Sequence, residues 1–166
     1  QLDPGQKTDL NGAGAADKNP EDNPLAYAWT VESGPEQGTL TGADQQYARF
    51  SAKRHGEYVL KLEVSSRANP RKAHATTSVK VKNVAPVAQL APPPQAHREE
   101  VELDASASSD ENGDPLTFEW KQLEGPATRT PDALSFTDAS GPRPHVTAAR
   151  PGTYKIQVIA KDGETE

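Results

Sequence analysis

Two stretches in the first half of the chain alternate apolar residues with small or polar ones. The first spans 25–31 and the second 58–64, and their apolar positions are Leu25, Tyr27, Trp29, Val31, Tyr58, Leu60, Leu62 and Val64. Alternation with a period of two is typical of a strand that buries one face. No window shows a convincing apolar stripe with a period of 3.6, and Gly or Pro interrupts the chain too often for helices of ordinary length. The pattern therefore predicts an all-β protein.

The second half of the chain repeats the first. PLAYAW at 24–29 returns as PLTFEW at 115–120, and Gly-Pro follows each of them, at 34–35 and at 125–126. LNGAGAAD at 10–17 matches LDASASSD at 103–110, and GEYVL at 56–60 matches GTYKI at 152–156. Three matched blocks in the same order indicate two tandem copies of one domain. A strand-like run gives way to Pro-rich sequence near 84, so the expected domains are 1–84 and 85–166.

Each copy has the features of a small two-sheet sandwich. The half-buried strand positions expected in the second copy are Leu116, Phe118, Trp120, Tyr154, Ile156 and Val158. A single Trp on a central strand, and a Tyr in a Gly-x-Tyr motif before a late strand, are typical of an immunoglobulin-like sandwich, in which that Tyr forms a tyrosine corner. Nothing in the second copy corresponds to TTSVKV at 76–81. Its last strand is therefore expected to be truncated, missing from this sequence or lying past its end.

One family combines these motifs. The second copy carries LDASASSDENGDPLTFEW at 103–120, Gly-Pro at 125–126, PGTY at 151–154 and KDG at 161–163. In this it resembles the PKD (polycystic kidney disease) domain family and its relatives among bacterial surface proteins, and the first copy resembles them more weakly. Both copies depart from the family's Trp-Asp-Phe-Gly-Asp-Gly motif, with WTVESGP at 29–35 and WKQLEGP at 120–126, and the first copy has SSR at 65–67 in place of the Asp-Gly. The resemblance is thus to a PKD-like variant.

The resemblance implies a non-catalytic module that is extracellular or at the cell surface, with the periplasm as an alternative. Such a module acts as a spacer or adhesion element of a larger surface or secreted protein. Its partners would be other domains of the same polypeptide and an extracellular protein or polysaccharide. The alternative function is an accessory module that binds polysaccharide or fibrous protein for a secreted hydrolase. Only 5% of the residues are aromatic, and most of these are expected in the cores, which leaves few rings on which a sugar could stack.

Composition and charge exclude several further classes of function. The 166 residues include no Cys, which excludes disulfides, thiolate zinc sites and cysteine nucleophiles. No apolar stretch approaches the roughly 20 residues that span a bilayer, so no membrane insertion is expected. Residues 1–84 carry 11 Lys and Arg against 10 Asp and Glu, and residues 85–166 carry 7 against 14. The basic stretches at 53–55 and 67–72 are short and contain no aromatic residue, so no nucleic-acid partner is expected.

The acidic turn DENGD at 110–114 is the candidate metal site. Ca²⁺ takes about six to eight oxygen ligands from carboxylates, carbonyls and water. Asp110 and Asp114 lie in the turn, and Asp104 and Asp162 could fold back toward it, which gives a candidate calcium set of four carboxylates. The alternative is that Asn-Gly and Asp-Pro are ordinary turn formers whose side chains bond nearby amides. In the first copy only Asp17, Glu21 and Asp22 are near, and Asn11 replaces the upstream Asp.

No catalytic residue is expected. The histidines His55, His74, His97 and His145 lie in polar contexts without the spacing of a zinc site. There is no Gly-x-Ser-x-Gly elbow, and nothing selects two carboxylates from the scattered Asp and Glu as a glycosidase pair. Apart from the candidate calcium ion, no cofactor is expected.

Overall fold

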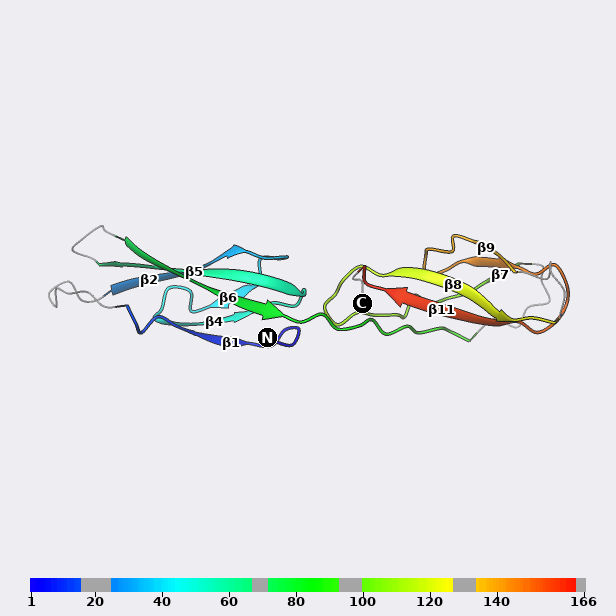
Figure 1. Cartoon of the computed structure of the whole chain (residues 1–166), viewed down its shortest axis with the longest axis horizontal. Helices are drawn as coiled ribbons and strands as arrows, with labels where there is room; N and C mark the ends of the chain where they lie inside the picture. Colours follow the sequence, from blue (N-terminus) through cyan, green and yellow to red (C-terminus); the bar gives the residue numbers. More distant parts are fainter. Residues whose placement is uncertain (16–24, 67–71, 93–99, 127–133, 164–166) are drawn as a thin grey trace. The chain divides into compact units, whose positions relative to one another are not determined.

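A computed structural model of the chain describes residues 1–15, 25–66, 72–92, 100–126 and 134–163. These residues form eleven strands and no helix (Figure 1). The chain divides into two compact units, Gln1–Val84 and Ala85–Glu166. The prediction of an all-β fold is confirmed, and none of the described segments is a helix long and apolar enough to cross a membrane.

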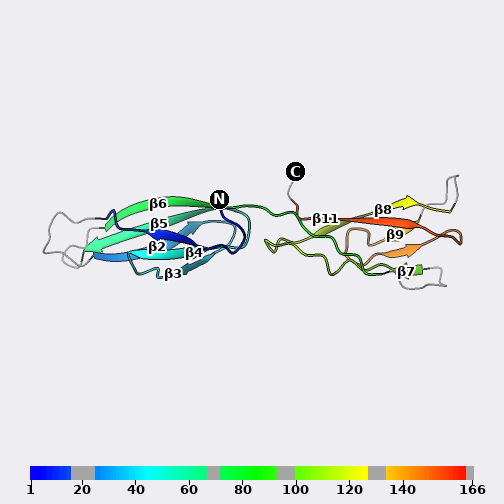
Figure 2. The same cartoon turned by 90° about the horizontal axis from the view of Figure 1, so that it is seen from below.

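The first unit consists of two antiparallel three-stranded sheets. One has the order β1-β4-β3, formed by Thr8–Asn11, Tyr47–Ser51 and Thr39–Thr41. The other has the order β2-β5-β6, formed by Leu25–Ser33, Gly56–Ser66 and Lys72–Val81. Figure 2 shows the two sheets of this unit as separate layers. This is the architecture of a small β-sandwich.

The alternation in the sequence decides which side chains lie between these sheets. Along β5, Tyr58, Leu60, Leu62 and Val64 are buried while the residues between them are more exposed. From the opposite sheet, Leu10, Ala48 and Phe50 join them, and the rings of Phe50 and Tyr58 lie 5.2 Å apart. Trp29 on β2 completes the cluster. The strands predicted at 25–31 and 58–64 are therefore confirmed.

The second unit has the same plan with one strand fewer. One sheet has the order β7-β10-β9, formed by Glu100–Glu102, His145–Thr147 and Ser135–Thr137. The other pairs β8, Thr117–Glu124, with β11, Lys155–Lys161. Leu116 and Tyr154 directly precede these last two strands rather than opening them. Within the described residues of this unit, no strand corresponds to β6.

Matched hydrogen bonds fix both cores. The indole N–H of Trp29 donates to the carbonyl oxygen of Gln45, and that of Trp120 donates to the carbonyl oxygen of Gly141, each at 3.1 Å. Such bonds let a buried indole keep a partner for its polar atom. The tyrosine corners predicted at Tyr58 and Tyr154 are also confirmed, because each hydroxyl bonds a carbonyl four residues earlier.

Candidate functional site

The acidic turn of the second unit lies between the end of β7 and the start of β8. Asp110 accepts a 3.1 Å hydrogen bond at Oδ1 from the amide of Asp114, and its own carbonyl accepts one of 3.2 Å from the amide of Gly113. Gly113 has a φ of 77°, the left-handed conformation that Gly adopts without strain. Asn112 is buried, with 3% of its surface exposed. The turn is therefore closed by its own backbone and by one carboxylate oxygen.

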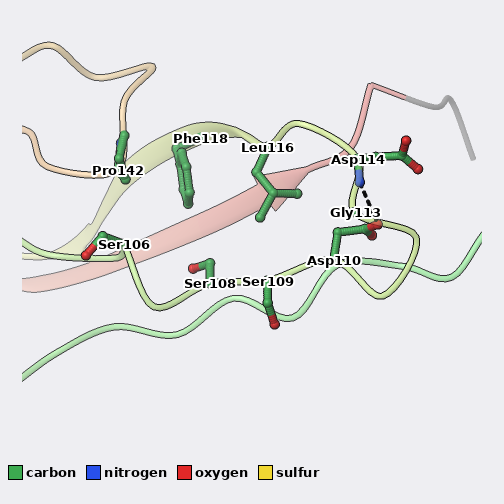
Figure 3. A pocket seen from close by; sticks show the side chains of 9 residues that line it. All are labelled: Ser106, Ser108, Ser109, Asp110, Gly113, Asp114, Leu116, Phe118 and Pro142. Carbon is green, nitrogen blue, oxygen red and sulfur yellow. Dashed lines mark hydrogen bonds between the residues drawn. The ribbon is translucent and has the colours of Figure 1, made fainter. Parts of the chain in front are cut away.

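One oxygen of this turn has no partner. Asp110 Oδ2 is buried and accepts no hydrogen bond. Figure 3 shows the carboxylate of Asp114 pointing away from that of Asp110. The turn borders a hollow of about 300 Å³, which Ser106, Ser108 and Ser109 also line (Figure 3). An unpartnered buried oxygen is costly, and a cation or an ordered water would satisfy it.

The carboxylate of Asp104 already has partners, Ser106 and Arg143. Its Oδ1 accepts hydrogen bonds from the amide and the hydroxyl of Ser106, at 2.8 and 2.6 Å, and its Oδ2 lies 3.0 Å from Arg143 Nη2. These donors stabilise the charged form, so the pKa of Asp104 lies below its ordinary value, first because of Ser106 and then because of Arg143. This matches the turn-forming alternative for Asp104, because its carboxylate bonds the backbone two residues ahead.

The four predicted calcium ligands are not brought together as a set. Among the described residues, no group of three or more His, Asp or Glu side chains is placed to hold a metal ion. Asp162 takes part in interactions of its own. Of the four carboxylates, that of Asp110 has a buried oxygen without a hydrogen-bond partner, and the calcium site stays a prediction. The acidic residues Asp17, Glu21 and Asp22 of the first copy lie outside the described residues.

Two of the described histidines, His74 and His145, lie beside carboxylates at the surface. His145 Nδ1 is 3.6 Å from Glu100 and its Nε2 is 3.7 Å from Glu102, and His74 Nδ1 is 3.7 Å from Glu63. Within the basic stretch at 53–55, the backbone amides of Lys53 and Arg54 bond Glu36 Oε1. His97 and residues 67–71 lie outside the described part of the chain.

Family models account for both units. A model described as "K319L-like, PKD domain" matches residues 1–82, and one described as "PKD domain" matches residues 83–165. The chain belongs to the PKD domain family. We call the two units the first and the second PKD domain. PKD domains are commonly extracellular modules and typically non-catalytic.

Solved structures resemble the chain at low identity. The solution structure of the PKD domain from the KIAA 1837 protein is 25% identical, with a TM-score of 0.39, over 46% of this chain and 71% of that one. The titin domains Z1Z2 in complex with telethonin are 13% identical, with a TM-score of 0.33, over 96% of this chain and 87% of that one. An endo-fucoidan hydrolase of glycoside hydrolase family 107 is 16% identical, with a TM-score of 0.30, and the match covers 84% of this chain and 22% of the hydrolase. No curated protein matches the chain.

The first PKD domain has an exposed aromatic residue that sequence reasoning missed. Tyr47 on β4 is 59% exposed, and it faces away from the core together with Arg49. Its Cα partner on β1 is Asn11, and Arg49 Nε lies 2.8 Å from the carboxylate of Asp9. The sequence carries a signal for this, because the apolar residues Ala48 and Phe50 alternate with Tyr47 and Arg49. In a strand this alternation places Tyr47 and Arg49 on the face opposite to Ala48 and Phe50. The ring therefore lies beside an amide and an ion pair on the outer face of the sheet β1-β4-β3.

Proposed function

We propose that this chain is a non-catalytic structural or interaction module, a spacer or adhesion element of a larger extracellular or cell-surface protein. The observation that carries the proposal is that the same polar side chains serve the fold in both PKD domains. The indole of Trp29 or Trp120 and the hydroxyl of Tyr58 or Tyr154 each bond a backbone carbonyl. Polar groups used in this way hold turns in place and are not available for chemistry. The partners of such a module are other domains of its polypeptide and extracellular proteins or polysaccharides.

A retention assay tests this proposal. The chain is mixed with insoluble cellulose, chitin and collagen, and the fraction that sediments with each solid is measured against a non-binding protein. A spacer stays in the supernatant with all three. Saturable retention on one of them would exclude a mere spacer and favour a binding role, that of an adhesion element or of a substrate-binding accessory module. Release of soluble sugar or peptide from a solid would overturn the non-catalytic proposal altogether.

Tyr47 supports the accessory-module alternative. An exposed aromatic ring offers a flat apolar face to the C–H groups of a sugar, and the neighbouring Asn11, Arg49 and Asp9 supply hydrogen-bonding groups. If a polysaccharide retains the chain, Tyr47→Ala is expected to abolish retention. The matched control is Leu123→Ala, which removes a 51% exposed apolar side chain from the second PKD domain. Equal retention of both variants would place binding elsewhere.

We also propose Asp110 as the residue that a calcium ion would contact in the second PKD domain. Its unpartnered Oδ2 supports this, and the carbonyls of the turn and water would supply the remaining oxygens. Calorimetric titration with Ca²⁺, and the melting temperature with and without Ca²⁺, test it. Asp110→Asn is expected to remove both effects, whereas Asp138→Asn, an exposed control in the same domain, keeps them. No heat and no change in melting temperature would end the proposal.

A further inference from the structure

One cross-strand pair of the first PKD domain has a histidine in place of an arginine in the second. In the first domain, Asp9 on β1 lies opposite Arg49 on β4, and Arg49 Nε is 2.8 Å from Asp9 Oδ1. In the second domain, Glu102 on β7 lies opposite His145 on β10. Each acid directly precedes its copy of the repeated block that begins at 10 or at 103. His145 therefore occupies the position of Arg49.

Carboxylates lie on both sides of the His145 imidazole. Its Nδ1 is 3.6 Å from Glu100 Oε1, and its Nε2 is 3.7 Å from Glu102 Oε2. A neutral imidazole has one N–H group, whereas a protonated imidazole has two and carries a positive charge. Protonation of His145 therefore places a cation between two anions of the neighbouring strand. Opposite charges on neighbouring strands stabilise the pairing of those strands.

The other groups around His145 keep their charge in the pH range in which an imidazole titrates. Arg143, two residues earlier, lies 3.0 Å from Asp104, just beyond the end of β7. On its other side, β10 pairs with β9, which places the uncharged Thr137 opposite His145. Carboxylates titrate near pH 4 and guanidinium groups stay charged, whereas an imidazole ordinarily changes charge between about pH 5 and 8. Among the described residues that face it, His145 is thus the group whose charge changes in that range.

We propose that His145 makes the pairing of β7 with β10 depend on pH in the second PKD domain. At the acidic end of the imidazole's titration range, the imidazolium attracts Glu100 and Glu102 and holds β7 on β10. As the pH rises through this range, the positive charge is lost, and the attraction is lost with it. In the first domain the guanidinium of Arg49 stays charged, so the pairing of β1 with β4 does not respond. This inference does not depend on the spacer or adhesion function.

The amide of Leu103 reports whether β7 is held in place. It donates a 3.0 Å hydrogen bond to the carbonyl oxygen of Pro144, next to the pair of Glu102 and His145. Amide hydrogen exchange of the full chain is measured at about pH 5.5 and about pH 8, on either side of the imidazole's ordinary pKa. Each rate is divided by that of an unstructured peptide at the same pH. Because exposed ion pairs contribute little, Leu103 is expected to be about two- to fivefold better protected at the lower pH.

Two variants of His145 separate its charge from its other contacts. His145→Arg copies the first domain and should protect Leu103 equally at both pH values. His145→Gln never carries a charge, so protection should stay at the lower value at both. The control is His74→Gln, which removes a histidine 3.7 Å from Glu63 in the first domain and should leave the response of Leu103 unchanged.

The converse substitution transfers the device to the first domain. Arg49→His should make the protection of the β1 amides fall as the pH rises, which is not expected in the native chain. Equal protection of Leu103 at both pH values in the native chain, better protection at the higher pH, or a response that survives in His145→Gln would each overturn the proposal.

Discussion

The Tyr58 hydroxyl donates a 2.8 Å hydrogen bond to the carbonyl oxygen of Arg54, four residues earlier in the chain. The second domain repeats this bond between Tyr154 and Arg150 at 2.9 Å. The Tyr58 ring is fully buried while its hydroxyl reaches the turn that leads into β5. Each bond therefore ties the turn before a strand, β5 or β11, to the core that the strand builds.

Removing either hydroxyl should destabilise its own domain. Tyr58→Phe keeps the ring and loses one hydrogen bond, which costs about 1 kcal/mol of unfolding free energy. Tyr154→Phe is expected to have a similar effect on the second domain. Amide hydrogen exchange of the full chain reports the two domains separately, in β5 and in β11. Tyr47→Phe is the control, since its ring lies on the surface. If the β5 amides exchange no faster in Tyr58→Phe than in this control, the prediction is contradicted.

Gly56 is required at the start of β5. Its φ is 130°, a conformation that residues with a side chain rarely adopt, and an added Cβ would lie 2.5 Å from Cγ of Pro35. Gly56→Ala should therefore destabilise the first domain by about 1–3 kcal/mol through the clash and the backbone strain. Urea unfolding of Gly56→Ala, Pro35→Ala and the double variant measures the coupling. The double variant should recover part of the loss, and strict additivity would show that the clash with Pro35 contributes nothing.

The parts of the fold that could be predicted are those with local, periodic signals. The alternation at 58–64 is long enough to define β5, and the repeated Gly-x-Tyr motif located both tyrosine corners. The strands β3, β7, β9 and β10 have three residues each, too few for a period to show.

The candidate site depended on contacts that no local pattern reveals. Asp104 is held by Arg143, which lies far along the chain and reaches Asp104 only after folding. Whether a carboxylate is free for a metal therefore depends on such distant partners as well as on near neighbours such as Ser106, which also bonds Asp104. Tyr47 was not singled out from the sequence, because composition counts rings without stating which face of a strand they occupy.

The unequal sheets of the two domains predict unequal costs of core truncation. Leu60 has no exposed surface, so Leu60→Ala is expected to cost about 2–5 kcal/mol. Ile156, its equivalent on β11, is partly exposed among the described residues, and Ile156→Ala should cost about half as much because less apolar area leaves water on folding. Hydrogen exchange of β5 and β11 in the full chain measures both. Equal costs would show that the smaller burial of Ile156 leaves the second core no weaker at this position.

The ion pairs of Glu119 predict that the second domain loses stability at acidic pH. Its carboxylate lies 2.6 Å from both Lys121 and Lys161, and these lysines lower the pKa of Glu119 to about 2. A carboxyl group whose pKa is depressed by folding contributes stability above its ordinary pKa of 4.5, and this contribution is lost as the pH falls from there toward 2. Glu119→Gln should therefore make the stability of the second domain depend less on pH between 4.5 and 2, and salt should have the same effect on the native chain by screening the pairs.

Carbon NMR titration of the Glu119 carboxyl group gives its pKa directly, with Glu124→Gln as a control that removes a different exposed ion pair. A midpoint near 4.5 in the folded chain would show that the two lysines do not hold this carboxylate.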